Sequence, residues 1–292
     1  MAYRGIATMR KRLIGSKLRR LREDHGMSID VAAQHLGVGK SVVYRQETGH
    51  TATSIADAKT YLDIYGIEDP VVRERIIALA RACRVRGWWF AYGETASDEH
   101  VDLADIEDLS TELRTVNLNS FHALLETEEF AQASLVNSRG LLAQEKLNPE
   151  DVLSLRRERR SILDRDDPPK VWAIVAEPVL SLEFEDPSVM IGQIEHLLNL
   201  GERPNVTIQL LPIGSPGNML IAGFLSVMGF DGTPDGSVVH TYRSFSDHPD
   251  QVKLELSRFS EVQSHALSRI DTRHRLEKLL ANLRAAQKEN IA

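Results

Sequence analysis

The residues best suited to recognising another molecule lie near the start of the chain, where cationic side chains are concentrated. Residues 1–50 contain ten Lys or Arg and four Asp or Glu, a formal charge of +6. Because the whole chain carries −7, the remaining residues carry −13. Clustered cations that neutralise phosphates release condensed counterions, so a locally basic segment attracts a polyanion even on an acidic protein. The asymmetry is typical of a nucleic-acid-binding module attached to a second domain, although a solvated basic face has the same composition.

Short helices joined by glycine-containing turns are predicted to position these cations. Apolar residues recur at helical spacing over 14–25, and Ser28 is a good N-cap for a helix that Gly37 ends. Further helices are predicted over 40–48 and 54–65.

The segment between Ser28 and Thr48 has the spacing of a helix-turn-helix. Its first helix carries two small alanines, where two helices would cross closely, and Gly37 can adopt the positive φ that the turn needs. With Val43 facing the core, five side chains of the second helix point outward: Lys40, Ser41, Val42, Tyr44 and Arg45. A helix presented in this way fits the major groove of DNA.

This segment, LRRLREDHGMSIDVAAQHLGVGKSVVYRQETG, resembles the XRE (Cro/C1-type) helix-turn-helix family. The resemblance implies a structural ion pair between Arg22 and Glu47, whereas without it both would be read as surface charges. It also implies base contacts from the second helix. Lys and Arg suit guanine O6 and N7, Val can touch a thymine methyl, and Ser discriminates little. The implied DNA-binding residues are Lys40, Ser41, Val42, Tyr44 and Arg45 for bases, and Ser28, Thr48 and His50 for phosphates.

Two positions depart from the family's pattern. Ile29 stands where the family has Gln after the capping Ser, so one phosphate contact is expected to be absent. Gln46 stands where an apolar core residue is usual, and a buried Gln needs hydrogen-bond partners. We therefore expect a second helix that packs less firmly and binds DNA less tightly than is usual in the family.

The rest of the chain alternates helical and strand-like segments. Strands are predicted over 171–180, 206–212, 224–230 and 237–243, with a turn at 231–236 between the last two. Helices are predicted over 120–138, 149–163, 189–201 and 251–287. The expected fold is an all-α helix-turn-helix domain followed by an α+β domain with a small, mostly antiparallel sheet.

Four parts are expected along the chain. They are a basic N-terminal tail (1–13), the helix-turn-helix domain (14–69), a connecting helix with an acidic linker (70–112) and an α+β regulatory or dimerisation domain (113–292). The linker contains eight acidic residues and no Lys or Arg over 94–112. It is read either as a solvated segment or as an acidic surface that docks on the basic head or repels DNA.

The C-terminal part resembles an antitoxin-like bacterial family that joins an XRE helix-turn-helix to a characteristic domain of poorly known function. The matching segments include LLETEEFA (124–131), RRERRSILDRDDPP (156–169), QIEHLLNLGERPNVTIQLLP (193–212) and GFLSVMGF (223–230). The resemblance implies regulation by a small partner protein encoded nearby. It also favours a homodimer on a palindromic double-stranded operator. A stripe of Leu276, Leu279, Leu280 and Leu283 would form the dimer seam or pack on its own domain.

Features of an enzyme are weak. Nucleophile-elbow, P-loop, dinucleotide-binding and HExxH patterns do not occur, and the ten histidines are scattered. We therefore expect no catalytic residue, no metal and no cofactor. The single cysteine fits a reducing cytoplasm, and no apolar run of membrane-spanning length occurs. The cluster Trp88–Trp89–Phe90 would line a ligand pocket or form an interdomain packing joint.

Two functions stay open for the C-terminal domain. In the first, it binds a partner protein, which a flat or grooved apolar surface would favour. In the second, it senses a small molecule and DNA binding is the output, which a cavity with converging polar groups would favour.

Overall fold

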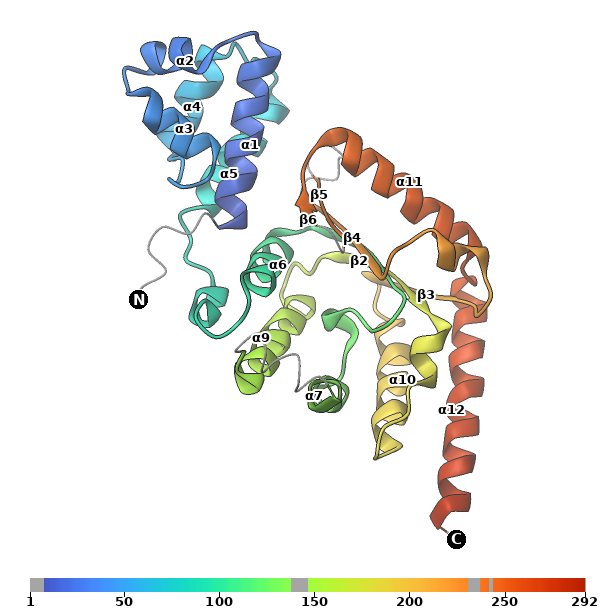
Figure 1. The fold of residues 1–292 in the computed structure, drawn as a ribbon. Helices are drawn as coiled ribbons and strands as arrows, with labels where there is room; N and C mark the ends of the chain where they lie inside the picture. The colour runs from blue at the N-terminus through green and yellow to red at the C-terminus, as the bar shows by residue number, and fades with distance from the viewer. Residues whose placement is uncertain (1–7, 138–146, 231–236, 242–243, 292) are drawn as a thin grey trace. The chain divides into compact units, whose positions relative to one another are not determined.

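The computed structural model describes residues 8–137, 147–230, 237–241 and 244–291 (Figure 1). The chain divides into two compact units, residues 1–109 and 110–292, and each is described by itself. The predicted turn at 231–236 lies outside the described residues, as do residues 1–7 of the predicted tail.

The N-terminal unit is entirely helical over its described residues. Its elements are α1 (Met9–Asp24), α2 (Ile29–Leu36), α3 (Lys40–Glu47), α4 (Ile55–Ile64), α5 (Pro70–Ala82), η1 (Trp88–Tyr92) and α6 (Asp98–Leu109). The first helix begins at Met9, inside the predicted tail, because Met9 and Leu13 are buried in the core of the unit. The unit also includes residues 70–109 of the predicted connecting helix and linker, whereas residues 110–112 belong to the C-terminal unit.

Local signals in the sequence explain the short helices. The Ser28 hydroxyl accepts a hydrogen bond from the Val31 amide and so caps α2. Gly37 ends that helix with a φ of 67° in the left-handed region. Ser54 and Asp57 form a reciprocal capping box at the start of α4.

The acidic helix α6 docks on the basic start of α1. Arg10 is buried, and its Nε lies 2.5 Å from Asp105 Oδ1. Its Nη2 lies 2.7 Å from Asp108 Oδ2, and its guanidinium stacks 4.2 Å from the centre of the Trp89 ring. Arg12 forms a second ion pair with Asp102. Of the two readings of this acidic segment, the structure shows docking on the basic start of α1. Trp89 packs in this contact within the N-terminal unit.

The C-terminal unit contains a six-stranded sheet in the order β3-β2-β1-β4-β5-β6. The strands are β1 (Glu112–Asn117), β2 (Lys170–Ala176), β3 (Val206–Leu211), β4 (Phe224–Gly229), β5 (Ser237–Thr241) and β6 (Ser244–Ser246). β1, β2 and β3 pair in parallel, and the other neighbours pair antiparallel. The predicted α+β class is confirmed, and the sheet is mixed. Sequence reasoning missed the central strand β1.

Helices cover the sheet on both sides (Figure 1). On one face, α11 (Pro249–His265) packs Val252, Phe259 and Val262 against strand residues such as Val116 and Ile174. On the other side lie α7 (Glu128–Asn137), α9 (Pro149–Ser161) and α10 (Ser188–Leu200). The predicted long helix over 251–287 is two helices, because the chain leaves helical geometry at Ala266.

The last helix, α12 (Arg269–Ile291), packs against α10 and β3 of its own unit. Leu276 and Leu280 are buried in this packing, whereas Leu279 and Leu283 are half-buried. The structure therefore gives two of the four leucines of the predicted stripe a role within the domain.

Replacing Arg10 with Met should lower the free energy of unfolding by about 3–5 kcal/mol at pH 8, because Asp105 would be left buried without its cation. Burial raises the pKa of Asp105 to about 6 from its ordinary value of 3.8. Ionisation of Asp105 therefore lowers the free energy of unfolding of the native protein as pH rises from 3.8 to about 6. In the variant, the free energy of unfolding should continue to fall above pH 6, because the carboxylate has lost its cation. At pH 5 the carboxyl is protonated in both proteins, so the loss should be much smaller.

Urea unfolding of the full chain, followed by circular dichroism at both pH values, measures this difference. Arg19→Met is the matched control, since Arg19 lies on the same helix and pairs with Glu23 in solvent. Its effect should stay below about 1 kcal/mol. An equal loss for Arg10→Met at pH 5 and pH 8 would contradict the proposed role of the ion pair.

Candidate nucleic-acid interface

The exposed face of α3 brings together four of the five side chains predicted to read bases. Lys40, Ser41, Tyr44 and Arg45 are exposed, and Val42 is half-buried. Val43, on the opposite face of the helix, is fully buried in the core. The arrangement leaves a row of donors and one large aromatic ring available to another molecule.

The two cations of this face differ in their partners. Lys40 Nζ lies 2.9 Å from Asp30 Oδ2 on α2, so its ammonium group forms an ion pair in the free protein. Arg45 has no hydrogen bond or ion pair from its side chain to any residue that the structure describes. Arg45 is therefore the cation that can meet an anion without first leaving a partner. The Lys40–Asp30 pair was not predicted, although an i, i+10 spacing across a turn is a signal that could have suggested it.

The orientation of α3 is fixed by a buried ion pair. Arg22 Nε donates to Glu47 Oε1 at 2.7 Å, and Nη2 donates to Oε2 at 3.0 Å. The Nη1 group donates to the Met27 carbonyl at 2.7 Å. The hydrogen bond to Glu47 raises the pKa of Arg22 above its ordinary value. This is the pair implied by the family resemblance, and it joins α1, the turn before α2 and the end of α3.

The structure does not show the loose packing expected at Gln46. Its side chain is buried, but Tyr61 donates a hydrogen bond to Oε1 at 2.5 Å. Its Nε2 donates to Asp57 Oδ2 at 3.0 Å. The amide thus links α3 to α4, and burial raises the pKa of Tyr61 so that it stays a neutral donor. Tyr61 and Asp57 supply the partners that a buried amide requires.

Gly15 is a structural residue of the site that sequence reasoning missed. It lies in the middle of α1, where that helix crosses the end of α3. A Cβ atom at this position would lie 2.5 Å from the carbonyl oxygen of Glu47 and closer still to that of Gln46. A glycine inside a helix is costly, so its presence here signals a close backbone approach.

The predicted phosphate-binding residues lie at the ends of the motif. Ser28 is exposed at the start of α2, where its hydroxyl already accepts the capping bond. Thr48 donates to the carbonyl of Tyr44 at 2.7 Å, and its hydroxyl lies 2.9 Å from His50 Nδ1. His50 is exposed. Each remains a prediction as a DNA contact.

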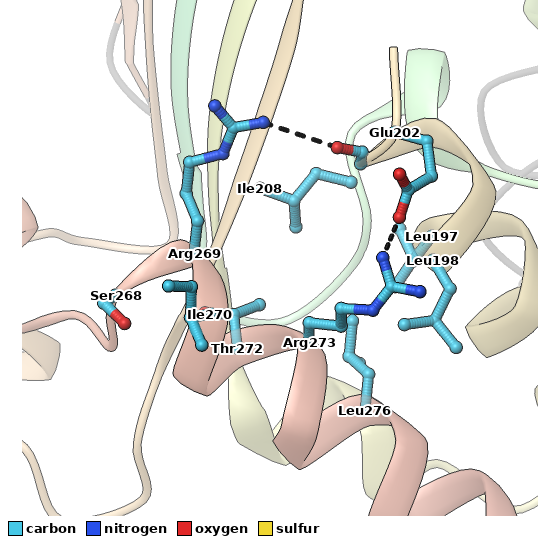
Figure 2. Close-up of a pocket in the computed structure, with 11 residues that line it drawn as sticks. Leu197, Leu198, Glu202, Ile208, Ser268, Arg269, Ile270, Thr272, Arg273 and Leu276 are labelled. Carbon is cyan, nitrogen blue, oxygen red and sulfur yellow. Dashed lines mark hydrogen bonds and ion pairs between the residues drawn. The ribbon is translucent and has the colours of Figure 1, made fainter.

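A second candidate site lies in the C-terminal unit, in a cavity of about 590 Å³ between α10, β3 and the start of α12 (Figure 2). Among the described residues, no cluster of three or more His, Cys, Asp or Glu could hold a metal ion. A search of those residues also found no helix long and apolar enough to span a membrane.

Two family comparisons match most of the chain. Residues 13–87 match a helix-turn-helix domain, and residues 101–278 match a domain of unknown function (DUF5753). No curated protein and no solved structure shows significant similarity to the chain.

Replacing Gly15 with Ala should lower the free energy of unfolding by about 1–3 kcal/mol, because the new methyl group would push α3 away from α1. Gly192→Ala is the matched control, since Gly192 also lies within a helix but a methyl group added there would meet no atom within 4 Å. That change should raise stability by about 0.5–1 kcal/mol. Urea unfolding measures both, and a stabilising Gly15→Ala change would contradict the close crossing.

Proposed function

The chain belongs to the family of the domain of unknown function DUF5753, joined here to a helix-turn-helix domain, and we propose that it is a sequence-specific transcriptional regulator of the XRE (Cro/C1) type. In this proposal α3 enters the major groove of double-stranded DNA and reads bases through Lys40, Ser41 and Arg45. The proposal assigns the chain no catalytic activity and places its action in the cytoplasm.

The observation that carries this proposal is an exposed arginine on a firmly held helix. The Arg45 side chain has no partner among the described residues, while Arg22–Glu47 and the Gln46–Tyr61 contact fix the helix beneath it. A guanidinium group that projects from a fixed helix can donate two parallel hydrogen bonds to guanine O6 and N7. A loosely held helix would lose this geometric selectivity.

We propose that the chain acts as a homodimer on a palindromic operator. One recognition helix of eight residues can contact only a few base pairs, so a second copy would double the contacts and fix the spacing of two half-sites.

For the C-terminal unit, the first candidate is an antitoxin-like domain that binds a small partner protein encoded nearby. Exposed apolar side chains after β3 support this candidate: Ile213 is 65% exposed and Met219 is 89% exposed. A protein partner would cover these apolar side chains, and Met adapts readily to a partner.

The second candidate is a ligand-sensing domain that controls DNA binding. The 590 Å³ cavity supports it, because the volume lies in the usual range for small-molecule sites and charged side chains line its apolar floor.

Replacing Arg45 with Ala should weaken binding to the selected operator about 10- to 100-fold, the loss expected for one bidentate base contact. Binding to unrelated DNA should change much less. The operator is first selected by the native protein from random duplexes, and both affinities are measured by fluorescence anisotropy. Arg81→Ala, an exposed arginine on α5, is the control and should leave both affinities unchanged. Equal losses on both DNAs would reduce Arg45 to a phosphate contact, and a native protein that selects no sequence would overturn the proposed function.

Replacing Asp30 with Asn should strengthen binding to operator and unrelated DNA about two- to fivefold at low salt, because Lys40 is released and one negative charge is removed. The gain should shrink as salt screens the charges. Asp63→Asn is the control, since Asp63 is an exposed carboxylate that pairs with Arg73 away from α3. An equal gain for both variants would show that the loss of one negative charge, and not the release of Lys40 from Asp30, strengthens DNA binding.

A further inference from the structure

The cavity in the C-terminal unit has a rigid frame. The Leu267 amide donates to the Leu210 carbonyl at 2.8 Å, and the Leu210 amide donates to Thr272 Oγ1 at 3.0 Å. The Gln209 side chain donates to the Leu267 carbonyl at 2.7 Å. These bonds tie the start of α12 to β3, so the side chains of its first turn project from a fixed base.

The floor of the cavity is apolar. Leu197, Ile208 and Leu276 are buried beneath it, and Leu198 is half-buried beside them. These side chains come from three different elements, α10, β3 and α12, and converge on the same space (Figure 2). A ligand that fills it would therefore need an apolar body.

Two arginines of α12 frame this floor, and their partners differ (Figure 2). Arg273 pairs with Glu202 and also with Glu277, at 2.9 Å in the second case, so carboxylates already compensate its charge. Arg269 donates one long hydrogen bond, 3.4 Å, to the Gly201 carbonyl. It forms no ion pair with any residue in the described part of the chain. One uncompensated cation therefore faces an apolar space.

We infer that this cavity binds a small molecule that combines one carboxylate with a compact apolar body. The carboxylate pairs with Arg269 at the rim, where a guanidinium group can donate two hydrogen bonds to it. The apolar body covers the floor formed by Leu197, Leu198 and Ile208. A dianion fits less well, because Glu202 lies on the same rim and the other arginine is already paired.

This inference rests on the second candidate function, ligand sensing, and names the chemical class of the ligand. Its probe is octanoate, which carries one carboxylate on a short apolar chain. Isothermal titration calorimetry on the full chain should show saturable binding of octanoate. Octanol, which lacks the charge, should bind about tenfold more weakly, and acetate, which lacks the apolar body, should not bind detectably.

The test variant is Arg269→Met, which keeps an apolar stem and removes the guanidinium group. It should weaken octanoate binding about 10- to 100-fold. The matched control is Arg284→Met, since Arg284 lies on the same helix and pairs with Glu195 of α10 outside the cavity. Its octanoate affinity should equal that of the native protein. Because Arg269 is exposed, both variants should unfold at the same urea concentration as the native chain.

Equal affinity for octanol and octanoate, native affinity in Arg269→Met, or no saturable binding would each overturn the inference. Octanoate binding is measured without DNA, and operator binding is measured without octanoate. A protein that binds the operator but not octanoate therefore refutes the ligand class alone. A protein that binds octanoate but selects no operator refutes the proposed function and leaves the cavity inference standing.

Discussion

The buried guanidinium group of Arg22 is the interaction on which the N-terminal unit depends. Its bonds to Glu47 and to the Met27 carbonyl hold together α1, the turn before α2 and the end of α3. A buried charge is costly unless its donors are satisfied, so the pair favours one arrangement of α1 and α3 over nearby alternatives. Gly15 permits the close crossing that this arrangement needs, and together they determine where the exposed face of α3 lies.

The structure divides the cations of the basic segment into two groups. Arg10, Arg12 and Arg22 are used internally, against carboxylates of α6 and α3. Arg45 stays available at the surface. The excess positive charge of the first 50 residues therefore overstates what DNA would meet, because part of it is neutralised by acidic residues from far along the chain. The acidic helix α6 supplies the carboxylates that neutralise Arg10 and Arg12.

The C-terminal unit presents two different surfaces to possible ligands. One is the exposed apolar segment around Ile213 and Met219, and the other is the cavity at the start of α12. A protein partner would use broad apolar contact, whereas the cavity combines an apolar floor with one arginine, Arg269, that forms no ion pair with any described residue. The cavity depends on the short segment between α11 and α12, which is hydrogen-bonded to the edge strand β3.

Features that depend on near neighbours could be predicted from the amino-acid sequence. Helical spacing, the cap at Ser28 and the turn at Gly37 predicted the helix-turn-helix, and apolar runs predicted most of the sheet. Contacts between distant residues required the folded chain. Arg10 and Asp105 are 95 residues apart, and the partners of Gln46 come from another helix. The central strand β1 has a largely polar sequence, so no apolar run marks it. Its place in the sheet follows from its pairing with β2 and β4. Short-range sequence patterns depend on the backbone geometry of helices and turns. Ion pairs, hydrogen bonds and strand pairings between distant residues depend on how the elements pack in the folded chain.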